Sequence, residues 1–398
     1  MTANRRPSPS LSLLLAASAA LVGTKTACAD DGSSDPTASD HHVGYRFNVY
    51  DEDAFSGGAF VGDAKRYHVD SQQFDLVTSA GGRDTLAFGA THEVMSGSSP
   101  WFLLPGPNQH PVQVMSGATI RDHRSEAHAA WTRDAGGNDT TTLSASYSKE
   151  RDYSATAIGA ERSIPLSSAL TLGFGASFSH DRIEPTDAAL YDRIERAQKN
   201  TTSFFGSLAW VLDRASVLQT GVQLNYQTGY LSDPYKLVSV GEDLLDDTRP
   251  DRRTEGAWLV RYRRAFTGSG SLHADYRFAW NSWGQHSQTL ELAWYQSLGD
   301  GWRLVPGVRY YTQDQARFYA PFFGADHGNF YSSDYRLGAY GAIAANIDVR
   351  KRFGRWEFSV GAERYHAATR YGIGGGDSAD PGVVSYTRAF AGLDFLFD

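Results

Sequence analysis

Several segments in the second half of the sequence carry a charged side chain on their polar face. These charges are the residues best suited to attract or repel a charged solute. Residues two apart share one face of a β-strand, so these charges would line up if the segments that carry them are strands. The charges predicted to share this face are Arg261, Arg277, Glu291, Arg309, Arg350 and Glu357. Their expected cross-strand pairs are Arg261–Arg277, Arg277–Glu291, Glu291–Arg309 and Arg350–Glu357.

This row of charges has two interpretations. Opposite charges at cross-strand spacing attract each other, and a row of them along a water-filled pore would select solutes by charge. The same row would also serve as a structural ladder that keeps one wall of a barrel rigid. The sequence leaves both interpretations open, because the interior of a membrane barrel is polar in either case.

A catalytic centre is not predicted. His180, Asp233, His286 and Ser287 fall near the ends of predicted strands, but twelve histidines spread along the chain make such neighbours common. The glycine-rich run 372–376 lacks the lysine and the helix of a phosphate-binding loop. We therefore expect no catalytic residues, no bound cofactor and no enzymatic activity.

An export leader is predicted at the N-terminus. Arg5 and Arg6 precede a short apolar run, and Ala27-Cys28-Ala29 fits the small-residue pattern of a cleavage site. The apolar run is shorter than the roughly 20 residues that a membrane-spanning helix needs. We expect residues 1–29 to be a signal peptide. The mature chain would then hold no cysteine, and so no disulfide and no thiolate metal site.

The segment after the leader is polar. Residues 30–42 are rich in Asp, Ser, Thr and Gly and are expected to form a flexible periplasmic segment. His41 and His42 could bind a metal, but adjacent imidazoles rarely form a site without further ligands, so no metal site is expected. Cys28 could accept a lipid, although Lys25 stands where a lipoprotein signal needs an apolar residue.

Composition agrees with a strand-rich chain that has one polar and one apolar surface. Aromatic residues make up 13% of the chain and charged residues 21%. Membrane barrels show such values, because aromatic girdles mark both membrane interfaces and one face of every strand meets a polar lumen. The formal net charge of -8 argues against a nucleic-acid partner, since a phosphate backbone binds basic surfaces.

Polar and apolar residues alternate along most of the chain from residue 43 onward. Between 216 and 229, Val222, Leu224 and Tyr226 would point to one side, while Gln223 and Asn225 would point to the other. This period of two predicts strands. Many of these segments approach a dozen residues, longer than the five or six residues that are usual in globular sheets and suited to a tilted crossing of a bilayer.

The connections between the predicted strands alternate between short and long. Outer-membrane barrels have short periplasmic turns and longer extracellular loops. We therefore predict an all-β protein: a transmembrane antiparallel β-barrel of about sixteen strands over residues 43–398. It would lie in a bacterial outer membrane, among outer-membrane lipids and placed there by the barrel assembly machinery. The expected strands are 43–50, 66–78, 83–94, 119–133, 138–150, 154–164, 169–181, 199–212, 216–230, 252–266, 271–281, 286–298, 302–315, 332–352, 355–370 and 383–397.

A series of short segments, in order along the chain, carries a family resemblance. The segments are 96–100, 148–153, 199–202, 231–236, 249–253, 276–278, 306–319 and 333–337. In these segments the chain resembles the domain-of-unknown-function 3570 family of Gram-negative outer-membrane proteins. It departs from the family at Asn281-Ser282-Trp283, where an acidic pair tends to precede the tryptophan. The resemblance implies an outer-membrane barrel whose gene lies beside those of a small lipoprotein, a thioredoxin-like protein and a flavin transferase.

Two classes of function fit these predictions. The first is a channel or transporter that passes a small solute through a charged lumen. The second is a non-conducting barrel that anchors or houses a periplasmic partner, such as the lipoprotein or redox protein that the resemblance implies. A third class of function, an outer-membrane enzyme, has less support in the sequence. The apolar stretch 101–105 would fold inward as a plug, or would pack on a neighbouring loop or partner.

Overall fold

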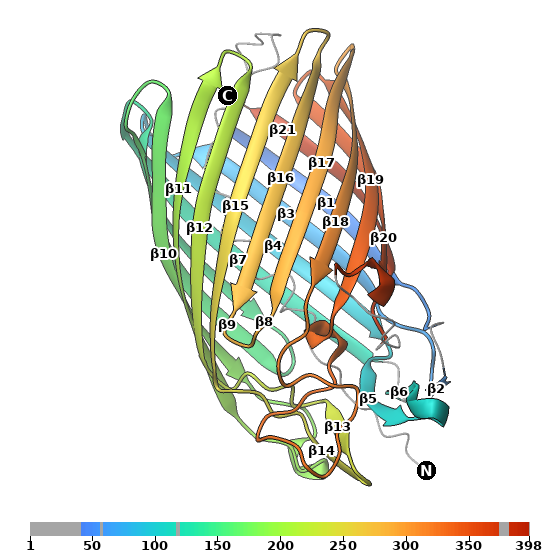
Figure 1. Ribbon diagram of the computed structural model, residues 1–398. Helices are drawn as coiled ribbons and strands as arrows, with labels where there is room; N and C mark the ends of the chain where they lie inside the picture. Colours follow the sequence, from blue (N-terminus) through green and yellow to red (C-terminus); the bar gives the residue numbers. More distant parts are fainter. Residues whose placement is uncertain (1–40, 56–58, 117–119, 374–381, 398) are drawn as a thin grey trace.

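Sixteen antiparallel strands close into a β-barrel (Figure 1). The computed structural model describes residues 41–55, 59–116, 120–373 and 382–397. The expected signal peptide and most of the segment 30–42 lie outside these residues. Around the ring the strands run β1-β21-β20-β19-β18-β17-β16-β15-β12-β11-β10-β9-β8-β7-β4-β3. The first and last strands therefore pair with each other, from His41 opposite Phe397 to Glu52 opposite Tyr386.

The barrel strands are long, and neighbours in the chain are joined as antiparallel hairpins. Their bounds are β1 (His41–Glu52), β3 (His68–Ser79), β4 (Asp84–Gly97), β7 (Ile120–Gly136), β8 (Asp139–Lys149), β9 (Tyr153–Pro165), β10 (Leu170–Ile183), β11 (Ala197–Asp213), β12 (Ser216–Gly229), β15 (Arg252–Phe266), β16 (Gly270–Asn281), β17 (His286–Gly299), β18 (Trp302–Gln313), β19 (Tyr340–Phe353), β20 (Trp356–Ala368) and β21 (Tyr386–Phe397).

The alternating sequence places apolar side chains on the outside of the barrel. Along β12, Val222, Leu224 and Tyr226 are 45%, 47% and 46% exposed, whereas Gln219 on the other face is 6% exposed. Exposed Phe, Leu, Ile, Val and Trp side chains continue this belt around the neighbouring strands. The outer surface is thus apolar and the lumen polar, the reverse of a soluble protein.

Short turns join the strands at one end of the barrel, which is the upper end in Figure 1. At the β17–β18 turn, Gly299, Asp300 and Gly301 all have positive φ, a conformation that favours glycine and is tolerated by aspartate. The long connections lie at the other end (Figure 1). The strand ends at His41 and Phe397 lie at the short-turn end, which we assign to the periplasm.

Further small elements cover the long-loop end. One sheet is formed by β2 (Phe60–Val61), β6 (Pro111–Met115) and β5 (Pro100–Pro105), and another by β13 (Leu237–Val240) and β14 (Asp243–Asp246). The 3-10 turns are η2 (Pro107–Gln109), η3 (Ala188–Leu190), η4 (Tyr335–Leu337) and η5 (Thr369–Tyr371). The fully buried side chains of Met115 and Val238 belong to this end. Within the described residues, every helix is too short or too polar to span a membrane.

Several expected strands differ from the structure at their ends. The strand expected at 332–352 begins at Tyr340, because 332–339 forms a loop that contains η4. The connection between β10 and β11 contains the short turn η3, which follows Asp187. The first strand begins at His41 rather than at residue 43, so the two histidines belong to the barrel.

Candidate functional site

Two long connections turn inward across the open end of the barrel. They are L5 (230–251, between β12 and β15) and L7 (314–339, between β18 and β19). The Nη2 atom of Arg249 on L5 lies 3.0 Å from Oδ2 of Asp334 on L7. The Nζ atom of Lys236 on L5 donates, at 3.0 Å, to the backbone oxygen of Pro100 in the connection from β4 to β7. L5 and L7 together are called the cap below.

A buried ion network holds the cap together. Asp334 is fully buried and accepts a hydrogen bond from the backbone nitrogen of Arg336 at the start of η4. Its carboxylate also contacts the guanidinium groups of Arg336 and Arg249. Burial alone would raise the pKa of this carboxyl, but Arg336, Lys236 and Arg249 hold it below its usual range. Arg336 also lies 2.8 Å from Asp233, which links L7 back to L5.

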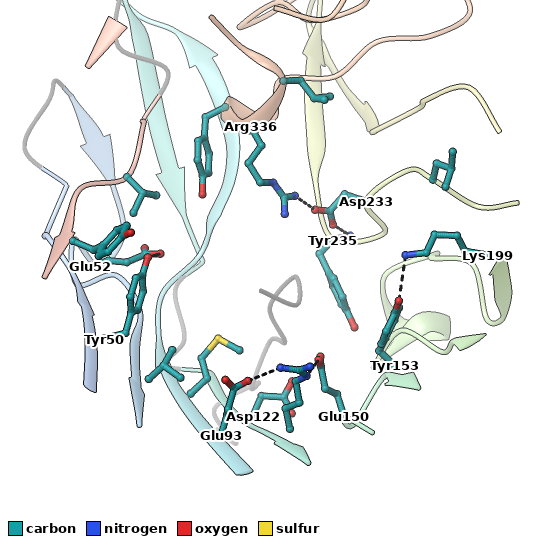
Figure 2. Close-up of a pocket in the computed structure, with 18 of the residues that line it drawn as sticks. Tyr50, Glu52, Glu93, Asp122, Glu150, Tyr153, Lys199, Asp233, Tyr235 and Arg336 are labelled. Carbon is teal, nitrogen blue, oxygen red and sulfur yellow. Dashed lines mark hydrogen bonds and ion pairs between the residues drawn. The ribbon is translucent and has the colours of Figure 1, made fainter. Parts of the chain in front are cut away.

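Tyr235 connects the cap to the opposite wall. Its hydroxyl donates to Asp152 in the tight 150–152 connection between β8 and β9, and it accepts from the backbone nitrogen of Thr186 at 3.2 Å. In Figure 2 the Tyr235 ring points from L5 into the cavity, toward the acidic residues below it. Burial raises the pKa of Asp152 to about 6, and the neighbouring carboxylates of Asp122 and Asp233 act in the same direction.

A cavity of about 880 Å³ lies between the cap and the lumen. Cap residues 231–235 and 335–337 line it from one side. Residues of β1, β3, β4, β7, β9 to β12 and β15 to β21 line it around the wall. Ligand sites in proteins are typically about 300–1,000 Å³, so the space suits a small molecule. We call this cavity the outer chamber.

One side of the outer chamber is acidic. A single guanidinium, Arg124, lies 3.0 Å from Glu93 and 3.8 Å from Glu150, and it also contacts Glu126. Lys199 lies 2.8 Å from Asp181. Figure 2 shows Glu93, Asp122 and Glu150 on the wall away from the cap. Arg124 and Lys199 thus line this side together with four carboxylates: Glu93, Asp122, Glu150 and Asp152.

The other side of the outer chamber is basic. Glu255 on β15 is shared by Arg253 and Arg277, with N···O distances of 2.9 Å and 3.8 Å. Glu363 on β20 is shared in the same way by Arg309 and Arg388, at 3.5 Å and 3.9 Å. Each carboxylate therefore neutralises one of two guanidiniums, which leaves a positive wall. In the ring order, β15 to β21 stand across the barrel from β4 to β11.

Tyrosine rings cover the wall beside these arginines. Tyr386 stacks on Tyr365 with ring centres 4.6 Å apart, and Tyr50 lies 4.7 Å from Tyr386 on the other side. The guanidinium of Arg309 lies 5.8 Å from the centre of the Tyr365 ring. Its Nη2 atom donates to the Tyr386 hydroxyl at 3.3 Å. The basic wall thus combines fixed positive charge with flat aromatic surface.

The six charges selected from the sequence lie on lumen-facing sides of their strands, but at different depths. Arg277 and Arg309 line the outer chamber. The other four, which are Arg261, Glu291, Arg350 and Glu357, alternate with lipid-facing neighbours and lie farther from the cap. Their role in selecting solutes remains a prediction.

Most of the expected pairings need correction. Glu291 does lie opposite Arg309. Arg277, however, lies opposite Leu259 and Thr289, and Arg261 lies opposite Asp275. Two connections differ from the expected ones: the turn from β15 to β16 and the loop from β16 to β17. The midpoint of each lies one residue earlier in the sequence than the expected pairs require. Each partner therefore shifts by two residues, which leaves the face unchanged because side chains alternate with period two.

The remaining predicted pair differs in geometry. Arg350 lies opposite Arg303 and Ser359, not opposite Glu357. Its Nη1 atom still approaches the Glu357 carboxylate diagonally, at 3.6 Å. The attraction between the two charges is therefore present without direct cross-strand pairing.

Sequence reasoning missed the cap and the acidic wall. The pattern over 332–352 alternates well enough to predict a strand, so Asp334 and Arg336 were not recognised as loop residues. A usable signal was present in the segments on which the family resemblance rests. Segments 148–153, 231–236, 249–253 and 333–337 all contribute to the lining of the outer chamber.

The apolar stretch 101–105 packs on neighbouring loops rather than into the lumen. It forms β5, which pairs with β6 and contacts β13 of L5. Figure 1 shows β5, β6 and β2 together at the edge of the long-loop end. The plug interpretation of this stretch is therefore wrong, and L5 and L7 are the segments that turn inward.

A closed barrel with an apolar outer belt, a polar lumen and short turns at one end defines the class: this is an outer-membrane β-barrel. The chain belongs to the family described as Protein of unknown function (DUF3570), whose model matches residues 11–387. No curated protein matches the sequence.

Solved structures of other outer-membrane barrels are similar in fold. The siderophore receptor PirA from Pseudomonas aeruginosa is 13% identical, with a TM-score of 0.41, over 82% of this chain. This chain covers 56% of the length of PirA. A bacterial polysaccharide outer membrane secretin is 8% identical, with a TM-score of 0.47, over 90% of this chain and 98% of its own. The CymD monoaromatic hydrocarbon channel is 8% identical, with a TM-score of 0.44, over 90% of this chain and 88% of its own.

Proposed function

We propose that the barrel passes small solutes carrying both a positive and a negative group across the outer membrane, and that the outer chamber binds them on the way. The observation that carries this proposal is the separation of charge across the chamber. Arg253, Arg277 and Arg309 stand on one wall, and the carboxylates around Arg124 stand on the other.

A dipolar solute would interact favourably with both walls at once. Its carboxylate would pair with the guanidiniums, which bind planar oxyanions through two parallel hydrogen bonds. Its ammonium group would face the acidic wall. A solute with charge of one sign would be attracted to one wall and repelled by the other, so it would gain less. We propose no catalytic role, because the chamber's charged groups are mainly engaged with one another.

Liposome swelling tests this proposal with three solutes of similar size: alanine, a zwitterion; lactate, an anion; and lactamide, which is neutral. Alanine should enter fastest through the purified barrel. Arg309→Gln should remove much of this advantage, because it takes away one of the guanidinium groups that would pair with the carboxylate of alanine. The matched control is Arg261→Gln, which changes a lumen arginine away from the chamber lining. Equal rates for the three solutes in the unmodified protein would contradict the proposal.

The second candidate is the non-conducting barrel that anchors a periplasmic lipoprotein or redox protein. The crossing of L5 and L7, held by the fully buried Asp334, favours it. Conductance in a planar bilayer separates the two functions, since a channel conducts alone and an anchor does not. Co-purification of a periplasmic protein with a barrel that conducts no ions would support the anchor.

A further inference from the structure

An imidazole and two carboxylates, which are side chains of types that can bind metal, meet at the periplasmic mouth of the barrel, at the end opposite to the outer chamber. His42 lies on β1, Asp75 on β3 and Asp394 on β21, and these strands are neighbours in the ring. The Nε2 atom of His42 lies 2.8 Å from Oδ2 of Asp75. One ligand atom from each of the three residues lies within 4.8 Å of the others.

The carboxylates of Asp75 and Asp394 converge in front of Gly44 on the strand between them. Gly44 on the middle strand lies opposite Asp394 on one side and Asp75 on the other. Strands two places apart are separated by about 10 Å, twice the usual spacing. The side chains close this gap: a Cβ atom at Gly44 would lie 2.6 Å from Oδ1 of Asp394 and 2.7 Å from Oδ1 of Asp75. The glycine therefore leaves room between two converging carboxylates.

In the part of the chain that the structure describes, His42 forms the ion pair with these carboxylates, and Arg46 acts on Asp394 at longer range. Among the described residues, no lysine or arginine lies within ion-pair distance of Asp75 or Asp394. Arg46, on the same face of β1, is directed toward the ring of Phe390, with its guanidinium 4.9 Å from the ring centre. Like charges at such separation repel, so a cation held between the carboxylates would stabilise the arrangement.

We propose that His42, Asp75 and Asp394 bind one divalent transition-metal ion of the Zn²⁺ type. An imidazole nitrogen with two carboxylates is a donor set for zinc and its neighbours, whereas Ca²⁺ takes oxygen ligands alone. The side chains of His42 and Asp75 are 32% and 45% exposed, so an ion can enter from the periplasmic side and keep water as a further ligand. Such an ion would bridge the first and last strands, where the barrel closes.

The adjacent His41 and His42 alone offer too few ligands for a metal site, and Asp75 and Asp394 supply further ligands beside His42. Titration of the folded barrel in detergent micelles with ZnCl₂, followed by calorimetry, tests the proposal. One Zn²⁺ should bind per barrel, more tightly than Ca²⁺. His42→Ala and Asp75→Asn should each weaken binding by about tenfold or more, since changes even outside the ligand shell cost about 10–100-fold.

His41→Ala is the matched control, because it removes the adjacent imidazole and should leave the affinity unchanged. Each variant is first checked for heat-modifiable migration on a gel, which shows that the barrel has folded. Zn²⁺ should also raise the temperature at which the folded form is lost in the unmodified protein, and less so in Asp75→Asn. Absence of binding, equal affinity in Asp75→Asn, or an equal loss in His41→Ala would overturn the proposal.

Discussion

Asp334 is the residue on which the cap depends most. Its carboxylate is fully enclosed between two guanidiniums, those of Arg249 and Arg336. Removing one partner of a buried ion pair typically costs about 3–5 kcal/mol, because the remaining charge is left unpaired. We expect Asp334→Ala to loosen L5 and L7 while the barrel itself still folds, since the strand ladders do not include this residue. Bilayer conductance should rise, and protease should cut the cap faster.

The control for this prediction lies in the same loop. Asp314 also belongs to L7, but its side chain is 59% exposed and pairs with the exposed His286. Exposed pairs contribute about 0–1 kcal/mol, so Asp314→Ala should leave conductance and proteolysis unchanged. If both variants behave like the unmodified protein, the ion network does not hold the cap.

Asp152 should make the cap sensitive to pH. Burial raises its pKa in the folded protein from 3.8 to about 6. The neutral acid is therefore favoured by folding, and this stabilisation is complete below about pH 4 and is lost as the pH rises through about 6. Two pKa units correspond to about 3 kcal/mol. The hydrogen bond from Tyr235 favours the ionised carboxylate and offsets only part of this loss. The cap should therefore be held less firmly, and channel openings should become more frequent, as the pH rises through this window.

The comparison variant for this pH effect is Asp152→Asn, which cannot titrate and keeps an acceptor for the Tyr235 hydroxyl. Its opening frequency should not change between about pH 4 and about pH 7. An unchanged pH dependence in this variant would show that another group controls the cap.

At the scale of single residues, sequence reasoning identified the face of each charge more reliably than its partner. Arg277 and Arg309 line the outer chamber, yet Arg277 pairs through Glu255 rather than with Glu291. Alternation decides the face, because a shift by two residues does not change it. The partner depends on where each turn closes, and that detail is weakly encoded in the local pattern.

At the scale of elements, β12 offers a clear test of the barrel's two faces. Leu224 is 47% exposed toward lipid, whereas the neighbouring Gln223 points inward, where its amide donates to Asn225 at 3.1 Å. An arginine near the middle of the lipid face costs about 2–4 kcal/mol. Leu224→Arg should therefore impair assembly, seen as loss of heat-modifiable migration, while Gln223→Arg should assemble normally. Failure of Gln223→Arg alone would reverse the assignment of the faces.

All sixteen strands could be predicted as elements, because the alternation of side chains is strong over about ten residues in each. The long-loop end could not. The segment 332–339 alternates like a strand, but Asp334 caps η4 and its charge is satisfied by partners on L5. A local pattern does not reveal a partner that lies far away in the sequence, such as Arg249.

At the scale of the whole molecule, the orientation in the membrane can be tested by labelling. Leu190 lies on the long-loop side, at the end of η3, and is 61% exposed, whereas Ser168 lies in the short turn between β9 and β10. In a Cys28→Ala background, Leu190→Cys should react with an impermeant thiol reagent on intact cells, and Ser168→Cys should react only after the outer membrane is opened. The reverse labelling pattern would show that the barrel has the opposite orientation in the membrane.

The closed shape itself was predictable from the even number of strands and the alternating connections. The chamber beneath the cap was not, because its walls come from segments far apart in the chain. Lys236 contacts Pro100, and Tyr235 contacts Asp152, across gaps in the sequence that no periodicity spans. These contacts become visible when the ring of strands brings the loops together.

The two charged walls of the chamber face each other across water. The salt concentration therefore controls the strength of the electrostatic interaction between a passing solute and these walls. Electrostatic screening acts over about 8 Å at 0.15 M ionic strength and about 3 Å at 1 M. The advantage of alanine over lactate in swelling assays should therefore shrink as salt is added, while the entry of neutral lactamide stays constant. The same barrel would therefore select solutes by their charge at low ionic strength and would lose this selectivity at high ionic strength.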